Sequence, residues 1–299
     1  MATVTVIIPT FNRRPLLLAA LSSVFSQTCQ DYEILVVDDG STDGTEEALA
    51  PLSTKIRYFW NPHGGEASAR NRGIREANTP YIAFLDSDDL WEPTFLQTTI
   101  STLDSDPELA MVTTGCLVIP GRERRPRIRE SSLRGDLFQV LFVRNFITAS
   151  TVVVRQDCFQ RVGLFNENLD QATDYDMWLR IARTFPIAFL NQPLCRWRQH
   201  SGNISGNKLR HRQCVLQVIE SHCHDRRISP RVSRIRRSKL KVSLGRTYLE
   251  LDQIKEAVAC FREAIGLAPF RVRPLCYLLT AWLKDRGRSY ISLANKPRS

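Results

Sequence analysis

Several features of secreted and membrane-spanning proteins are absent from this sequence. No apolar stretch among its 299 residues approaches the 18 or so residues of a membrane-spanning helix. Its start lacks a basic segment followed by an apolar one, because residues 3–9 already have the composition of a β-strand. The eight cysteines occur without any Cys-x-x-Cys pair, which in an unsecreted chain predicts reduced, mostly buried thiols. We therefore expect a cytoplasmic protein.

Glycine-rich phosphate loops are also absent. A dinucleotide-binding fold needs Gly-x-Gly-x-x-Gly directly after its first strand, but Pro9-Thr10-Phe11-Asn12 stands at this place. The P-loop pattern is missing as well. Carboxylates recur at the predicted strand ends instead, so we expect phosphate groups to be bound through a metal ion.

Aromatic residues are absent from the most basic part of the chain. Residues 205–246 hold twelve Lys and Arg residues against two acidic ones, and the rest of the chain holds 29 of each sign. Without aromatic side chains, this segment offers no stacking platform for nucleic acid. A basic face suits an anionic lipid surface better. We expect peripheral contact with the inner face of the membrane and no nucleic-acid partner.

The first half of the chain alternates between predicted strands and helices. Four apolar segments rich in β-branched or aromatic residues are predicted strands: 3–9, 32–37, 56–60 and 81–85. Segments 15–26 and 46–52 have helical patterns, and a glycine-containing loop at 63–73 leads into another helix. This alternation predicts an α/β fold with a mostly parallel central sheet, right-handed crossovers and flanking helices.

Acidic residues follow two of these strands directly. Asp38 and Asp39 come after the second strand, and Asp86-Ser87-Asp88-Asp89 comes after the fourth. In open α/β sheets, ligands bind beyond the carboxyl ends of the strands. Clustered carboxylates in such a place suit Mg²⁺ or Mn²⁺. The alternative is an acidic turn that caps the helix beginning at Glu92-Pro93.

Three features of the second half allow two interpretations each. The loop at 122–134, with six arginines and two glutamates, is either a solvated connection or a loop that recognises a substrate. Asp174 falls in the first turn of a predicted helix, where the helix dipole favours a carboxylate whether or not it has a chemical role. His200 is either structural or part of the metal site.

Several motifs in register resemble family 2 glycosyltransferases of the GT-A fold, over about residues 3–205. The motifs are Val6-Ile7-Ile8-Pro9-Thr10-Phe11-Asn12-Arg13, Val36-Val37-Asp38-Asp39-Gly40-Ser41-Thr42-Asp43, Ala69-Arg70-Asn71-Arg72-Gly73 and Leu85-Asp86-Ser87-Asp88-Asp89. The resemblance implies a site for a nucleotide diphosphate sugar at Pro9, Thr10, Asn12, Asp38, Asp39, Arg70, Asp86 and Ser87. It also implies that Mn²⁺ or Mg²⁺ is held by Asp88, with Asp86 nearby, and that His200 either completes the metal shell or contacts the diphosphate.

The same resemblance extends to the acceptor half. Thr173-Asp174-Tyr175-Asp176-Met177-Trp178-Leu179-Arg180 is similar to the family's Glu-Asp-Tyr-Asp-Leu-Trp-Leu-Arg block, whose first aspartate is the catalytic base. This implies that Asp174 is the catalytic residue. Thr173 replaces the family's usual glutamate, a departure that bears on fine positioning or on acceptor choice. Residues 196–205 are similar to the family's Arg-x-His-x-x-Asn-x-Ser ending.

The C-terminal part has a different pattern. Seven residues fit the 34-residue tetratricopeptide repeat: Leu244, Gly245, Tyr248, Ala257, Phe261, Ala264 and Pro269. We expect a catalytic domain at 1–205, a basic helical linker at 206–237, a tetratricopeptide-like repeat with a capping helix at 238–285, and a disordered tail at 286–299. The apolar helix beginning near Pro274 is expected to pack on the repeat, with docking on a membrane or a protein partner as the alternative.

These patterns lead to one functional expectation. The chain is expected to be a metal-dependent, inverting glycosyltransferase of the hexosyltransferase type that acts on a glycan or lipid-linked acceptor in surface polysaccharide synthesis. The alternative is a catalytically degenerate scaffold that binds a sugar nucleotide and recruits partners through its helical repeat.

Overall fold

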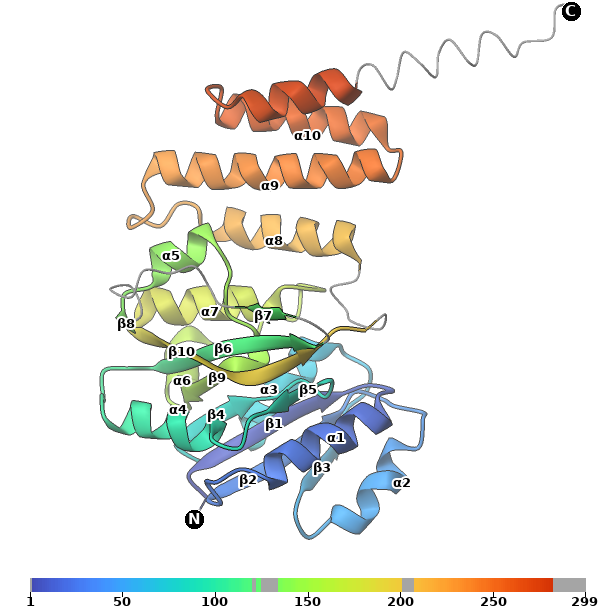
Figure 1. Ribbon diagram of the computed structural model, residues 1–299, viewed down its shortest axis with the longest axis vertical. Coiled ribbons are helices and arrows are strands. Elements are labelled where there is room, and N and C mark those ends of the chain that lie inside the picture. Colours follow the sequence, from blue (N-terminus) through green and yellow to red (C-terminus); the bar gives the residue numbers. More distant parts are fainter. Residues whose placement is uncertain (1, 120–121, 125–133, 201–206, 282–299) are drawn as a thin grey trace, which may run out of the picture. The chain divides into compact units, whose positions relative to one another are not determined.

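The computed structural model describes residues 2–119, 122–124, 134–200 and 207–281 (Figure 1). The chain forms two compact units, Met1–Asn203 and Ile204–Ser299. The predicted tail at 286–299 and most of the basic loop at 122–134 lie outside the described residues. All eight cysteines are free thiols, as expected. Within the described residues, no helix combines the length and hydrophobicity needed to cross a bilayer.

The first unit begins with four parallel strands in the order β3-β2-β1-β4. Their bounds are β1 Val4–Thr10, β2 Tyr32–Asp38, β3 Arg57–Trp60 and β4 Tyr81–Phe84. The intervening helices are α1 Arg14–Phe25, α2 Thr45–Leu49 with the short 3₁₀ helix Ala50–Leu52, and α3 Glu66–Glu76. Because β1, β2 and β4 are apolar and buried from end to end or nearly so, they form the centre of the core. The predicted α/β class is confirmed.

Antiparallel pairing begins beyond β4, so the sheet as a whole is mixed. The order continues as β9-β6-β10-β5, with β9 antiparallel to both β4 and β6. The remaining strands are β5 Asp89–Trp91, β6 Met111–Ile119, β7 Arg122–Arg124, β8 Arg134–Gly135, β9 Val152–Arg155 and β10 Ile187–Arg198. The helices are α4 Phe95–Asp104, α5 Phe138–Val143, the 3₁₀ helix Ala149–Thr151, α6 Cys158–Val162 and α7 Thr173–Thr184. Because β1, β2 and β4 are parallel, their carboxyl ends lie on the same side of the sheet, called here its carboxyl edge.

The second unit is helical. It contains α8 Lys208–His222, α9 Pro230–Glu250, α10 Ile254–Leu267 and a further helical segment at 272–281. Helix α9 is continuous across residues 237–238, where the sequence suggested a boundary. The ring of Tyr277 stacks on that of Phe261 with centroids 5.6 Å apart, so this last segment packs on the α9–α10 hairpin. Its other face leaves Leu275 and Leu279 exposed. That the hairpin is a tetratricopeptide repeat stays a prediction.

Candidate functional site

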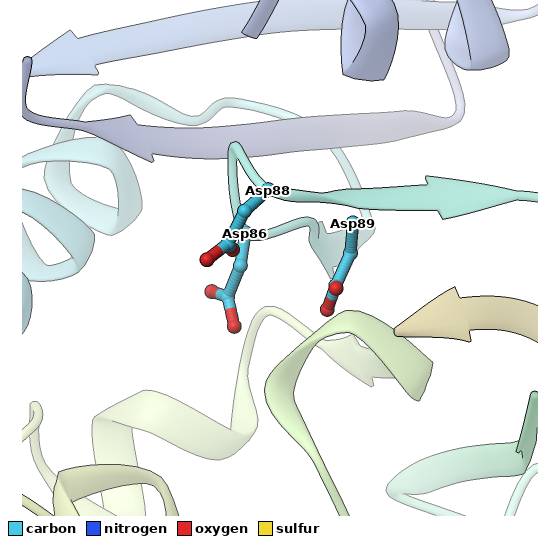
Figure 2. Close-up of side chains that lie close together, drawn as sticks. All are labelled: Asp86, Asp88 and Asp89. Carbon is cyan, nitrogen blue, oxygen red and sulfur yellow. The ribbon is translucent and has the colours of Figure 1, made fainter. Parts of the chain in front are cut away.

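Three carboxylates meet between β4 and β5. Strand β4 ends at Phe84, and the following turn carries Asp86 and Asp88 before β5 starts at Asp89. Figure 2 shows all three side chains projecting from this stretch of chain. Each offers an oxygen atom, and these atoms all lie within 4.8 Å of one another. Hard oxygen donors at this spacing are the ligand type that Mg²⁺ and Mn²⁺ prefer, so the residues present fit the expected ion.

Asp88 is held from two sides. Arg13, in the loop after β1, donates from a terminal guanidinium nitrogen to Asp88 Oδ2 over 2.7 Å. His200, after β10, places Nε2 3.0 Å from the same oxygen. The histidine therefore lies beside the acidic cluster, which is the position that the family resemblance implied. Arg13 belongs to the first motif, but no local pattern indicates that its side chain reaches Asp88, 75 positions later.

Asp89 has an internal role. Its carboxylate accepts a 2.6 Å hydrogen bond from Ser150 Oγ and a 3.1 Å bond from the backbone N–H of Arg198. Burial, followed by the nearby charges of Asp86 and Asp88, raises its pKa well above the usual value of an aspartate. Asp89 therefore ties the β4–β5 turn to the 3₁₀ helix Ala149–Thr151 and to β10.

Asp38 and Asp39 organise the loops beyond β2. Asp38 accepts bonds from Ser41 N over 2.8 Å and from Tyr58 Oη over 2.9 Å. Asp39 accepts bonds from the backbone N–H groups of Gly64 and Gly65, at 2.9 and 2.8 Å. Both carboxylates are buried at the carboxyl edge of the sheet, beside the loop that follows β1.

The loop after β1 is fixed against this region. Asn12 adopts a left-handed backbone conformation with φ of 50°. Its side-chain oxygen accepts a 2.8 Å bond from Thr42 N, and its own N–H donates to Ser41 Oγ over 2.8 Å. The neighbouring Phe11 ring is exposed and lies against the ring of His63, with centroids 4.4 Å apart. Thus the implied nucleotide residues from β1 and β2 come together, with Pro9 and Thr10 at the end of β1.

Two polar residues of this edge are deeply buried. Thr10 Oγ1 has no hydrogen-bond partner within the described part of the chain. Ser87 is buried between Asp86 and Asp88, and its carbonyl oxygen accepts a 3.3 Å bond from Arg198. The unsatisfied Thr10 hydroxyl is a feature expected of a site that a polar ligand completes.

Arg70 lies beneath the acidic cluster. It projects from α3 and is buried, and it donates to Asp86 over 2.6 Å and to Glu66 over 2.5 Å. Burial alone would lower the pKa of Arg70, but the carboxylates of Glu66, Asp86 and Asp174 together raise it. Arg70 is therefore a permanent cation among these acids. Glu66 was not singled out in the sequence, because a glutamate at a helix N-terminus is common.

Asp174 belongs to the same electrostatic cluster. It lies in the first turn of α7, after Ala172, whose φ of 58° is unusual for a residue with a side chain. The pKa of the nearby Glu66 is raised to about 7. Desolvation of the Glu66 carboxyl group is the largest cause, and the charges of Asp86, Asp174 and Asp88 add to it, although Arg70 opposes the shift. The side chain of Glu66 keeps 32% of its surface exposed. The charge of Asp174 thus acts on two residues that lie more than 100 positions earlier in the sequence, Glu66 and Arg70.

Comparison with known sequences gives a consistent result. The family model described as "Glycosyl transferase family 2" matches residues 5–163, which is more than half of the chain. An uncharacterized glycosyltransferase of Rickettsia typhi is 30% identical over 212 residues, which cover 69% of this chain and 67% of that protein. The succinoglycan biosynthesis protein ExoW of Rhizobium meliloti is 33% identical over 184 residues, covering 54% of this chain and 58% of ExoW.

Solved structures share the fold at lower sequence identity. S. aureus TarS in complex with UDP-GlcNAc superposes with a TM-score of 0.67 at 16% identity, covering 95% of this chain and 88% of that one. The mannosyltransferase PcManGT from Pyrobaculum calidifontis, in complex with GDP-Man and Mn²⁺, has a TM-score of 0.62 at 21% identity, covering 97% and 82%. This likeness confirms the GT-A fold expected from the sequence.

Proposed function

Because the chain belongs to glycosyl transferase family 2, we propose that it transfers a sugar from a nucleotide diphosphate sugar to a hydroxyl group of a glycan or lipid-linked acceptor. One observation carries this proposal: Asp86 and Asp88 lie in one carboxylate cluster at the end of β4, and the charges of Asp86 and Asp174 both act on the buried Arg70 beside it. The relationship to ExoW, a succinoglycan biosynthesis protein, supports a role in surface polysaccharide synthesis. The donor class is supported by neighbours that bind UDP-GlcNAc and GDP-Man.

The donor would bind along the carboxyl edge of β1, β2 and β4. Eight residues are proposed to contact or shape its site: Pro9, Thr10, Asn12, Asp38, Asp39, Arg70, Asp86 and Ser87. Hydrogen bonds from Asn12 to Ser41 and Thr42 join the loop after β1 to the loop after β2. These bonds would keep the two loops in place before the nucleotide of the donor binds. The buried hydroxyl of Thr10 is available to a polar group of the nucleotide.

Asp88 and Asp86 would hold Mn²⁺ or Mg²⁺, and His200 would be a further ligand. When bound, the cation supplies Lewis-acid stabilisation of the diphosphate leaving group. Arg13 and His200 both contact Asp88 Oδ2, an oxygen atom that the ion would also use. The Mn²⁺ in the related PcManGT complex supports this assignment.

Asp174 would act as the catalytic base. Its place in the first turn of α7 allows it to accept a proton from the acceptor hydroxyl as that oxygen attacks the anomeric carbon. The bond from the anomeric carbon to the diphosphate oxygen breaks as the new glycosidic bond forms. A single displacement from the face opposite the leaving group inverts the anomeric configuration, which is the proposed outcome.

Thermal stabilisation by nucleotides tests the proposal. Purified protein would be heated with a panel of nucleotide diphosphates and their sugars, including UDP-GlcNAc and GDP-mannose, with and without Mn²⁺. We expect one nucleotide to raise the melting temperature only with Mn²⁺, and this effect to vanish in Asp88→Ala. Asp31→Ala, at the opposite edge of the sheet, is the control. Metal-dependent binding without any turnover would instead favour the scaffold function, and no response to any nucleotide would contradict the proposal.

The second unit is proposed to provide contacts outside the catalytic site. Arg231, Arg234, Lys239 and Arg246 are exposed on α9, so a basic surface is available to anionic lipid. The α9–α10 hairpin is proposed as a tetratricopeptide-like repeat that could also hold a protein partner. Binding to anionic vesicles, compared with oligonucleotides at matched salt, separates a lipid surface from a nucleic-acid surface. Stronger binding to the oligonucleotides would contradict the lipid assignment.

A further inference from the structure

Asn71 holds one residue of a distant loop through both of its backbone polar groups. Its Oδ1 atom accepts a 2.8 Å hydrogen bond from the N–H of Phe165, and its Nδ2 atom donates a 2.9 Å bond to the carbonyl oxygen of the same residue. Nδ2 also donates to Glu167 Oε1 over 2.7 Å. Only 1% of Asn71 is exposed. A side-chain amide bound in this way fixes the position of a backbone segment 94 residues away.

The residue that Asn71 holds is a central packing contact. The Phe165 ring meets the Phe84 ring edge-to-face, with centroids 5.5 Å apart, and Phe84 is the last residue of β4. On another side it meets the Trp178 ring at 5.9 Å, and Trp178 lies on α7. Phe165 therefore lies between the strand that leads to Asp86 and the helix that starts beside Asp174.

The residue preceding Asn71 completes the connection. The Arg70 guanidinium lies 5.4 Å from the Phe165 ring centroid and donates to Asp86 over 2.6 Å. Adjacent positions of α3 thus contact the donor-side carboxylate and the loop that leads into α7. A shift of this loop would move α7, and with it Asp174, relative to Asp86.

We propose that Asn71 is a positioning residue, which holds the segment from Phe165 to Glu167 so that Asp174 stays in register with the donor site. The inference rests on the proposed function, in which Asp174 is the base. Asn71 itself touches neither donor nor acceptor and acts through Phe165. Misplacement of a catalytic group by about 1 Å can lower a rate by about 100-fold, so small movements of the loop matter.

Three variants separate positioning from general stability. Asn71→Ala removes all three hydrogen bonds. Asn71→Asp keeps the acceptor for Phe165 N but faces the Glu167 carboxylate, and adding Glu167→Gln to it removes this repulsion and supplies a new donor. The control is Gln156→Ala, because the Gln156 side chain also bonds a backbone carbonyl, that of Ala77, over 2.7 Å, and among the described residues this bond reaches neither the loop nor the acidic cluster.

The first readout is steady-state release of nucleoside diphosphate from UDP-GlcNAc or GDP-mannose, whichever stabilises the wild type. We expect kcat to fall about 10- to 100-fold in Asn71→Ala and Asn71→Asp. We expect KM and nucleotide-dependent stabilisation to change less than about threefold, because the donor loops are untouched. The double variant with Glu167→Gln should recover at least part of kcat. A fall no larger than in Gln156→Ala, or a rise in KM that accounts for the loss, would overturn the proposal.

The second readout needs no substrate. Backbone hydrogen exchange of peptides within 163–173 should become at least tenfold faster in Asn71→Ala, with β1 and β2 unchanged. Unchanged exchange would overturn the proposal even if turnover fell. If the wild type neither binds nor turns over any nucleotide sugar, the proposed function fails and the positioning role fails with it. Normal wild-type turnover with an unaffected Asn71→Ala kcat would overturn only the role of Asn71.

Discussion

Arg13 donates a 2.7 Å hydrogen bond to the Oδ2 atom of Asp88, although the two residues lie 75 positions apart. Only 20% of the arginine side chain and 7% of the aspartate side chain are exposed, so water screens the pair weakly. This cation helps the fold to tolerate three neighbouring carboxylates. It also occupies an oxygen that a divalent cation would use, so Arg13 and the metal are expected to compete.

Removal of this competitor should strengthen metal binding in the absence of nucleotide. For Arg13→Gln we expect the affinity for Mn²⁺ to rise roughly 5- to 30-fold, because loss of one positive charge near a partly buried site removes about 1–2 kcal/mol of repulsion. Isothermal titration with MnCl₂ measures this. Arg14→Gln is the matched control, since Arg14 lies near Asp43 instead. Weaker Mn²⁺ binding in Arg13→Gln would show that the arginine supports the ion.

Two aspartates in the first turn of α7 should behave differently. Asp174→Asn is expected to lower turnover by about 10²–10⁴-fold while nucleotide binding persists, because an amide cannot remove the proton from the hydroxyl group of the acceptor. Asp176→Asn should instead lower the free energy of unfolding by about 1–3 kcal/mol, since Asp176 pairs with Arg180 over 2.9 Å. Rate assays and urea denaturation of both variants test this. Near-normal turnover of Asp174→Asn would exclude it as the base.

Glu66 should make stability depend on pH in the absence of metal. Its pKa of about 7 in the fold lies above the usual value of 4.5, so the folded state holds its proton over a range where the unfolded chain has released it. Stability from this group is therefore present below pH 4.5 and is lost as pH rises through 7. In EDTA, the melting temperature of Glu66→Gln should rise relative to that of the wild type as the pH increases from 5 to 8. A constant difference over this range would contradict the shift.

The sequence predicts the first half of the sheet well because its signals are local. Runs of β-branched and apolar residues identify β1, β2 and β4, and acidic residues directly after a strand must lie at the carboxyl edge of a parallel sheet. The twelve-residue strand β10 gives no such signal. It contains Pro193 and an irregular register around that residue, and proline argues against a regular interior strand.

Contacts across long sequence distances are the part of the site that local patterns do not contain. Residue type alone does not distinguish Asp89 from Asp86 and Asp88, and its bonds to Ser150 and Arg198 depend on where the 3₁₀ helix Ala149–Thr151 and β10 pack. The amide bonds of Asn71 to Phe165 likewise follow from tertiary packing. Residue types and spacing therefore predict which side chains reach the sheet edge, but not which of them hold one another there.

Two glycines of the second unit offer a test of the α9–α10 packing. A Cβ atom at Gly245 would lie 2.6 Å from the Phe261 ring, so the two helices approach closely at this point. Gly245→Ala should therefore destabilise the hairpin by about 1–3 kcal/mol.

Gly266, near the end of α10, provides the control, because no atom lies within 4 Å of a Cβ atom built at this position. Gly266→Ala should be neutral or stabilise by up to about 1 kcal/mol, because alanine favours helix over glycine. Chemical denaturation followed by hydrogen exchange of α9 and α10 compares the two. Equal stability of both variants would contradict the close packing of Gly245 on Phe261.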